Sequence, residues 1–330
     1  MAEIKKSKYS ERFRELGLVF FILLVSIIVQ IRNHEFLTLP NINNILTNTA
    51  ILSILSVGMM MVLLTGGIDL SIGATMAFTG MVCALTANAH PTAPVVLLVL
   101  EGVAIGAVIG VVIGILVARF SILPIIATLG LMNVIRGSTF LVSGGQWVSA
   151  YQMPAGFKAM ATGRFLGINN LIIIAIVIYI AFYYFINFTR TGRRIYAVGS
   201  NPEAAEITGL PRKRITALVY VLMGALSGLA GVLWVAKFAS AQGDTASGYE
   251  MNVIAACVLG GVSVSGGRGK VFGLILGVIL FGILANALPL INVSPFWQQA
   301  IQGFVILAAI ITNVLIKRNN DRTTLRRRVI

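Results

Sequence analysis

Long apolar runs, separated by short polar or basic segments, repeat along almost the whole chain. Each run is long enough, or nearly so, to cross a hydrocarbon layer of about 30 Å as an α-helix. The ten runs expected to span a membrane are residues 16–31, 47–64, 70–88, 95–118, 121–142, 168–187, 215–236, 250–264, 271–289 and 297–316. The pattern therefore predicts an all-α polytopic membrane protein with about ten transmembrane helices.

The basic residues select both the number of spans and their orientation. With a cytoplasmic N-terminus, 20 of the 25 Lys and Arg residues lie on the cytoplasmic side. The exceptions are Arg136, inside a span, and Arg32, Lys158, Arg164 and Lys237, on the outer side. Nine or eleven spans would move the basic tail or the 190–214 loop across the membrane, against the positive-inside rule. We therefore predict ten spans with both termini in the cytoplasm.

Composition agrees with this organisation. Hydrophobic residues make up 57% of the chain and charged residues 11%, which excludes a soluble domain and a disordered segment. The expected parts are a cytoplasmic tail (1–15), a transmembrane region (16–316) with a cytoplasmic loop (188–214), and a basic cytoplasmic tail (317–330). The net charge of +14 sits at span ends, which favours orientation and contact with anionic lipid over nucleic-acid binding.

Two glycine-rich segments resemble each other at an offset of 194 residues, namely 65–73 and 259–267. In the ten-span topology both follow an outside-to-inside span and precede an inside-to-outside one, which predicts an internal repeat in the same orientation. Both are too rich in glycine for continuous helix. Because non-helical backbone at membrane depth must be buried or line a watery cavity, the segments indicate a translocation path.

Other glycines recur every four residues within spans. Gly106, Gly110 and Gly114 do so in the fourth predicted span, and Gly224 and Gly228 in the seventh. Small residues at this spacing let two helix backbones approach closely within lipid. We therefore expect helix-packing surfaces in a compact bundle.

The residue inventory argues against an enzyme. The glycine-rich run before Lys270 lacks the first Gly and the final Ser or Thr of a phosphate-binding loop. The only histidines, His34 and His90, fall in predicted outer loops, so no base accompanies a serine nucleophile and no metal cluster forms. Cys83 and Cys257 lie in separate apolar runs and are interpreted as buried small side chains. We predict no catalytic site, metal or cofactor.

Few ionisable residues fall inside spans, and such residues normally face a partner or a cavity. Glu101 and Arg136 each lie six residues from the outer end of neighbouring predicted spans, at a similar depth of about 9 Å. We expect them to form an ion pair; polar lining of a solute path is the alternative. Asp69 and Glu101 are too few acids for a proton relay, which weakens an ion-coupled carrier.

The 188–214 loop contains a short helix with clear start and stop signals. Asn201 is a favourable N-cap and Pro202 a favourable first helical residue. Glu203 in the first turn complements the helix dipole, and Gly209 ends the helix after about two turns. A capped helix between basic flanks on the inner face is suited to docking another protein.

At this point the chain resembles the permease subunits of ATP-binding-cassette importers for monosaccharides and autoinducer-2. The loop is similar to the Glu-Ala-Ala…Gly motif of importer permeases, and its Leu210–Pro211 follows the glycine directly, without the Ile-x-Leu-Pro ending of the longer motif. The residues that match the motif are Glu203, Ala204, Ala205 and Gly209. The sugar-permease branch is resembled at 65–71, 128–130, Arg136, Gly137, 259–267, Gly269 and Gly273.

The resemblance implies a permease fold like that of the vitamin B12 importer, with two permease subunits, two cytoplasmic ATPase subunits and an extracytoplasmic solute-binding protein in a bacterial inner membrane. Residues 201–205 and Gly209 would then couple to the ATPase. Candidates for the translocation path are Asp69, Asn133, Arg136, Asn286, Trp297 and Gln298. Candidates for binding-protein docking, in outer loops 143–169 and 237–250, are Trp147, Tyr151, Asp244 and Tyr249.

Two other function classes stay open at this stage. An ion-coupled secondary sugar carrier would not depend on ATPase and binding-protein genes beside this one. A membrane scaffold that binds lipid or a signal would give no solute flux in reconstituted vesicles. The sequence does not select among sugars, nor between a homodimer and a heterodimer of permeases.

Overall fold

The structure is a computed structural model of the chain. It describes residues 2–294 and residues 297, 300, 303, 304, 307 and 311, with side chains from residue 15 onward. The predicted tail 317–330 lies outside the described residues, as does most of the tenth predicted span, 297–316.

Among the described residues, eight helices are long and apolar enough to cross a membrane. They are α1 (Ala2–Arg32, apolar from Glu15), α2 (Leu39–Leu64), α3 (Ile72–Ala89), α4 (Val95–Gly114), α5 (Pro124–Ser143), α7 (Asn170–Phe188), α10 (Arg212–Phe238) and α12 (Val271–Leu290). A single π-helical turn, η1 (Ile115–Arg119), continues α4. Eight of the ten predicted spans are therefore confirmed as helices, although α2 begins eight residues earlier than expected.

The eighth predicted span, 250–264, is wrong as a full-length helix. Only α11 (Tyr249–Leu259, 11 residues) forms there. At about 1.5 Å per residue this helix covers roughly half of a 30 Å hydrocarbon layer. Gly260 and Gly261 end it, and Gly261 has a φ of 81°, which other residues rarely adopt.

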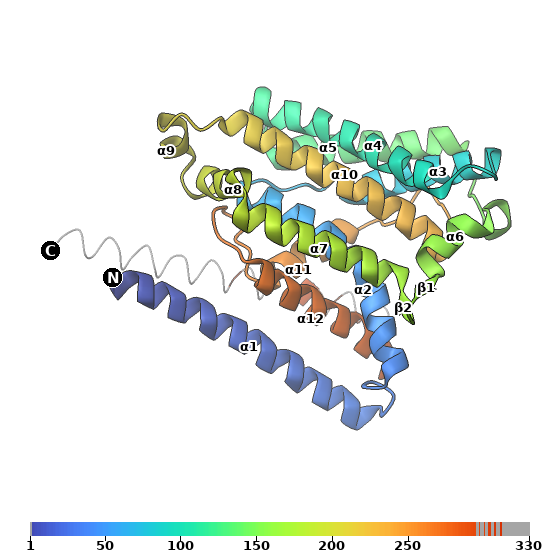
Figure 1. Cartoon of the computed structure of the whole chain (residues 1–330), viewed down its shortest axis with the longest axis horizontal. Coiled ribbons are helices and arrows are strands. Elements are labelled where there is room, and N and C mark those ends of the chain that lie inside the picture. Colours follow the sequence, from blue (N-terminus) through green and yellow to red (C-terminus); the bar gives the residue numbers. More distant parts are fainter. Residues whose placement is uncertain are drawn as a thin grey trace.

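Several short elements lie at the two ends of the bundle, whereas α11 lies in its middle (Figure 1). At one end lie α8 (Arg190–Ser200) and α9 (Pro202–Ile207), together with the start of α1; we call it the α8–α9 end. At the other, the α6 end, lie η2 (Ala150–Gln152), α6 (Ala155–Thr162) and a two-stranded antiparallel hairpin of β1 (Arg164–Phe165) and β2 (Ile168–Asn169). The sequence pattern does not predict α8 or α6.

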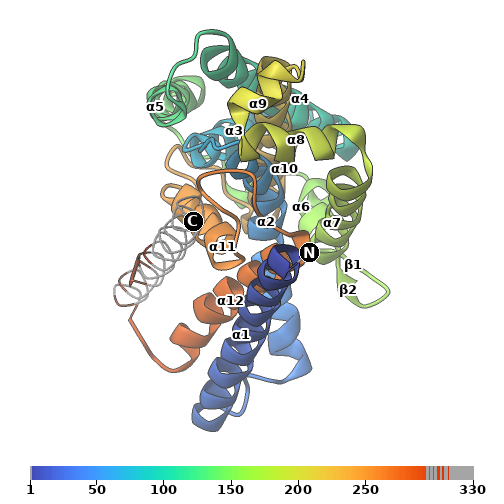
Figure 2. The same ribbon diagram turned by 90° about the vertical axis from the view of Figure 1, so that its left-hand side faces the viewer.

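Helices α2 and α10 form the centre of the bundle, and α1 lies at its edge (Figure 2). The apolar window of α2 is 83% buried, whereas that of α1 is 6% buried. Helix α10 packs most extensively on α4, where Gly106 faces Gly224 and Gly228, and Gly110 faces the backbone of Tyr220. The predicted glycine packing surface is therefore confirmed, because a Cβ at these positions would collide with the facing backbone.

Candidate functional site

Residues 65–71 form a non-helical segment that enters the bundle from the α8–α9 end. At its start, the Leu64 carbonyl accepts a hydrogen bond from the Gly267 amide at 2.9 Å. Further along, the Tyr220 hydroxyl of α10 donates to the Ile68 carbonyl at 3.4 Å. Helix begins again only at Ile72. The predicted interruption of the helical pattern is therefore present.

A second non-helical segment, residues 239–248, enters from the opposite, α6 end. Ala241 forms a β-bridge with Val148 of the 143–169 loop. Gly243 then packs against the Phe140 ring of α5, which would have to shift to admit a Cβ. Finally, the carbonyl oxygen of Ala246 reaches Gly73 at the start of α3. The sequence pattern treats this segment as an outer loop, but it descends between helices before α11 begins.

Arg136 of α5 holds this descending segment. Its Nη1 donates to the carbonyl oxygens of Gly243 at 2.9 Å and Thr245 at 2.7 Å. The nearby acidic groups that act on the guanidinium are Glu250 and Asp244. Non-helical backbone inside a membrane needs such donors, because lipid supplies none. Arg136 thus satisfies carbonyl groups that a helix would have satisfied internally.

The predicted ion pair between Glu101 and Arg136 is wrong. No salt bridge joins the two side chains, both of which lie in the described part of the chain, and the Glu101 carboxylate instead accepts a hydrogen bond from the Thr86 hydroxyl at 2.9 Å. The reason is packing: α5 follows α4 in the chain but packs mainly on α3. Similar depth in consecutive spans therefore did not bring the charges together.

Asp69 is fully buried, and its carboxylate is used locally. Oδ1 accepts hydrogen bonds from the Ser71 backbone amide at 2.9 Å and the Ser71 hydroxyl at 2.6 Å. These bonds stabilise the turn from which α3 starts. Asp69 is not among the residues that line the cavity described next.

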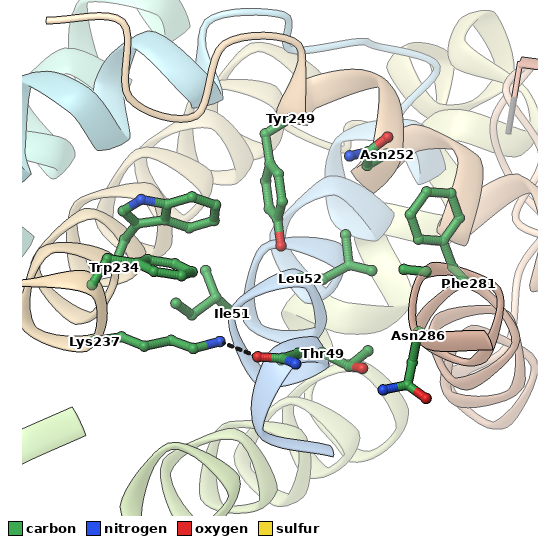
Figure 3. Close-up of a pocket in the computed structure, with 13 residues that line it drawn as sticks. Thr49, Ile51, Leu52, Trp234, Lys237, Tyr249, Asn252, Phe281 and Asn286 are labelled. Atoms are coloured by element: carbon green, nitrogen blue, oxygen red, sulfur yellow. Dashed lines mark hydrogen bonds between the residues drawn. The ribbon is translucent and has the colours of Figure 1, made fainter. Parts of the chain in front are cut away.

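A cavity of about 230 Å³ lies nearer the α6 end, between α2, α10, α11 and α12 (Figure 3). Its wall combines aromatic rings with amide, hydroxyl and ammonium groups. The polar and aromatic side chains that line it are Asn48, Thr49, Trp234, Lys237, Phe238, Tyr249, Asn252, Phe281 and Asn286. Trp234 and Tyr249 meet edge to face, with ring centroids 5.2 Å apart.

Of the five predicted path residues that the structure describes, only Asn286 lines this cavity, where its amide exchanges two 3.1 Å hydrogen bonds with Asn41 of α2. Asn133 is exposed on α5 and bonds its own helix, at the Leu129 carbonyl. Trp297 is exposed, and Gln298 lies outside the described residues. Trp234 and Asn252 were not predicted as lining residues, because nothing in the sequence around either one indicates that their side chains face the same cavity.

A second cleft, of about 490 Å³, opens between α2, α7 and α12. Its wall is mostly apolar, with Ile172, Ile176 and Ile275 among the lining residues. The Tyr179 hydroxyl is buried there without a hydrogen-bond partner within the described structure. This cleft has fewer polar groups than the first cavity and suits a hydrophilic solute less well.

The helix predicted in the 188–214 loop is present as α9, and its predicted start and end are confirmed. The Asn201 side chain accepts from the Ala204 amide at 3.0 Å, and Pro202 and Glu203 occupy the first turn. Gly209 adopts a φ of 77° just past the helix, and the Leu210 amide donates to the Ala205 carbonyl at 3.0 Å. Ala205 is buried, whereas Glu203 and Ala204 lie on the accessible side.

Helix α8 connects α9 to both predicted repeat segments. The backbone of Gly199 lies against the Leu64 carbonyl so closely that a Cβ could not fit, and Gly267 lies against Ser200. The Tyr196 hydroxyl donates to the Gly269 carbonyl at 2.8 Å. Burial raises the pKa of Tyr196 to about 12, so the hydroxyl keeps its proton at neutral pH. Helix α8 therefore packs directly against Leu64 and against residues 266–269.

The docking candidates divide into two groups. Trp147 is 62% exposed, Tyr151 is 87% exposed, and Asp244 is also exposed at the α6 end. Tyr249, by contrast, packs on Trp234 and points into the cavity (Figure 3). The structure therefore places Tyr249 in the cavity wall rather than on a docking surface.

These features define a multi-pass helical membrane protein with non-helical segments between its long helices and a capped helix pair at one end. The model of the family "Branched-chain amino acid transport system / permease component" matches residues 41–310, and the chain belongs to this family.

Curated relatives match over nearly the whole chain. The ribose import permease protein RbsC of Bacillus subtilis is 38% identical, over 94% of this chain and 95% of the relative. RbsC of Escherichia coli K12 is 37% identical, over 90% and 92%. The galactose/methyl galactoside import permease protein MglC of Salmonella typhimurium is 34% identical, over 94% and 97%. No solved structure matches the chain.

Proposed function

We propose that the chain is the permease subunit of an ATP-binding-cassette importer and forms the path for a monosaccharide or sugar-like solute. The observation that carries the proposal is the capped helix α9. Through α8 this helix is joined to both glycine-rich segments of the predicted repeat, at Leu64 and at residues 266–269. The relatives are import permeases for ribose and for galactose or methyl galactoside, which favours an importer subunit over an ion-coupled carrier.

The α8–α9 end faces the cytoplasm in this proposal, as the positive-inside rule requires. Helix α9 is the ATPase contact, through Asn201, Pro202, Glu203, Ala204, Ala205 and Gly209. Nucleotide-driven movement of α9 passes to α8, and from α8 to the backbone at Leu64 and Gly267, which are hydrogen-bonded to each other. Both glycine-rich segments of the predicted repeat then respond to the movement of α9. ATP hydrolysis itself takes place on the partner subunits.

The α6 end receives the solute from an extracytoplasmic binding protein. Trp147, Tyr151 and Asp244 offer two exposed rings and a carboxylate at that end. The β-bridge between Val148 and Ala241 ties the two loops that carry them, so one docking event acts on both. A second permease subunit and membrane lipid complete the assembly, and a bacterial inner membrane is the proposed location.

Reconstitution tests the proposal. The purified permease is placed in liposomes with the ATPase and binding protein whose genes neighbour its own, and uptake of labelled ribose, arabinose and galactose is followed. We expect uptake of at least one sugar that needs both ATP and the binding protein. Uptake driven by an ion gradient without ATP would support the secondary carrier instead. Absence of any flux, with a correctly folded complex, would reject the importer.

A further inference from the structure

The described residues that line the polar cavity belong to α2, α10, α11 and α12. Two of these helices adjoin the non-helical segment 239–248: α10 precedes it and α11 follows it. The segment therefore connects the helix that carries Trp234 and Lys237 to the helix that carries Tyr249 and Asn252. Segment 239–248 is reached from the α6 end, so docking at that end would change the shape of the cavity.

Several polar groups in the wall lack a partner within the protein. Among the described residues, the side chains of Tyr249, Asn252 and Trp234 make no hydrogen bond, although all three line the cavity. In Figure 3 the Tyr249 hydroxyl points into the cavity, with Trp234 and Asn252 on either side of its ring. Polar groups at this depth normally find partners. The cavity thus presents unfilled donors and acceptors to whatever occupies it.

Lys237 adds a cation that is held by neutral groups. Its Nζ donates to Asn48 Oδ1 at 2.8 Å, marked by the dashed line in Figure 3, and to the Thr47 carbonyl at 3.4 Å. It also lies 4.9 Å from the centre of the Phe238 ring. No carboxylate pairs with it in the described part of the chain. The ammonium is therefore oriented by amide, carbonyl and aromatic neighbours rather than neutralised.

We infer that this cavity is a solute subsite of the permease and that its ligand class is a neutral monosaccharide. The inference rests on the proposed function and adds the location and the recognising groups. The rings of Trp234, Phe238 and Tyr249 suit the C–H face of a sugar, and Asn252, Lys237 and the Tyr249 hydroxyl suit its hydroxyl groups. Pockets for drug-sized ligands measure about 300–1,000 Å³, so a cavity of about 230 Å³ fits a smaller solute.

Direct binding is tested with the intact permease in detergent, without binding protein. Replacing the other two tryptophans (Trp147→Phe, Trp297→Phe) leaves Trp234 as the only indole. We expect the sugar transported by the wild-type complex to change Trp234 fluorescence in a saturable way. A sugar acid, such as galacturonate, is the anionic comparison; tighter binding of the acid than of the neutral sugar would overturn the ligand class.

Matched variants test the location. Asn252→Ala and Asn252→Ser should weaken sugar binding about 3–10-fold, the value of one hydrogen bond. Asn133→Ala removes an exposed amide outside the cavity and should leave binding unchanged. Ala285→Trp should fill the cavity and abolish uptake, whereas Val96→Trp, on the exposed face of α4, should not. Both variants are compared by uptake alone, because each adds an indole that would contribute to the fluorescence.

The outcomes separate the inference from the proposed function. If the wild-type complex carries out ATP-dependent sugar uptake while Trp234 fluorescence is silent and Ala285→Trp transports normally, the subsite lies elsewhere and the inference is wrong. If the wild-type complex transports no sugar, the proposed function fails first. Folded yield and monodispersity of each variant, measured before assay, exclude misfolding as the cause of a loss.

Discussion

Gly73 at the start of α3 lies directly against Ala246 of the 239–248 segment. A Cβ built on Gly73 would stand 2.5 Å from the Ala246 carbonyl oxygen and 2.8 Å from Glu250 Oε2. Ala246 itself has a φ of 55°, an uncommon conformation for a residue with a side chain. This contact joins the segment that enters from the α8–α9 end to the segment that enters from the α6 end.

Gly73→Ala should therefore destabilise the permease. The added methyl group meets backbone, which cannot rotate away as a side chain can, and overpacking of this kind typically costs about 1–3 kcal/mol. We expect a lower unfolding temperature in detergent and a lower folded yield. Gly137→Ala is the matched control, because that glycine lies in helix α5 with open space around it. Equal unfolding temperatures for the two variants would contradict the contact.

Arg136→Met should destabilise the protein, whereas Glu101 should be energetically independent of it. Losing a hydrogen bond to a charged group costs about 1.5–3 kcal/mol, and Arg136 donates two. In a double-mutant cycle of Arg136→Met with Glu101→Gln, the changes in unfolding free energy of the two single variants should sum to that of the double variant within about 0.5 kcal/mol. A clearly larger coupling energy would contradict this expectation and support the ion pair that the sequence predicts between Glu101 and Arg136.

Gly209→Val should abolish ATP-dependent uptake without preventing membrane insertion. A β-branched residue strongly resists the φ of 77° that ends α9. Gly209→Asn is the control, since asparagine tolerates this conformation. Co-purification of the ATPase measures docking, and uptake measures coupling. If the valine variant retains both at the level of the asparagine variant, α9 is not the coupling helix.

Asn201→Ala should weaken the same site more mildly. It removes the N-cap hydrogen bond to the Ala204 amide, a change that typically costs about 1 kcal/mol of helix stability. We expect partial loss of ATPase co-purification and of uptake, with Asn201→Ser close to wild type because serine also caps. Identical behaviour of the alanine and serine variants would show that the cap is irrelevant to docking.

Photo-crosslinkers placed at Trp147 and Asp244 should capture the binding protein, because both side chains are exposed at the α6 end. A crosslinker at Tyr249 should capture it poorly, since that side chain points into the cavity. Ile207, 87% exposed on α9 at the opposite end, provides a negative control for this partner. Capture at Ile207 rather than at the two outer positions would reverse the proposed orientation.

Local sequence determined much of this protein. Apolar run length is sufficient to locate eight spans, because a helix in lipid must satisfy its backbone internally over a fixed thickness. Asn201, Pro202 and Gly209 likewise define α9, since capping and a positive φ depend on neighbours a few residues away. The repeated glycines of α4 and α10 predicted close contact between helices, because residues spaced four apart lie on one face of a helix.

Tertiary structure decided which faces meet. The apolar run at 250–264 does not reveal that α11 is short. Helix α11 begins only after segment 239–248 has entered the bundle, and this entry depends on tertiary contacts. Arg136 and Glu101 have matching depths, yet α5 packs on α3 and turns Arg136 to the carbonyls of residues 243 and 245. The cavity unites Asn48, Lys237 and Asn252 from three helices. Sequence spacing cannot give such a site, because rotation and pairing of helices depend on contacts between residues that are far apart along the chain.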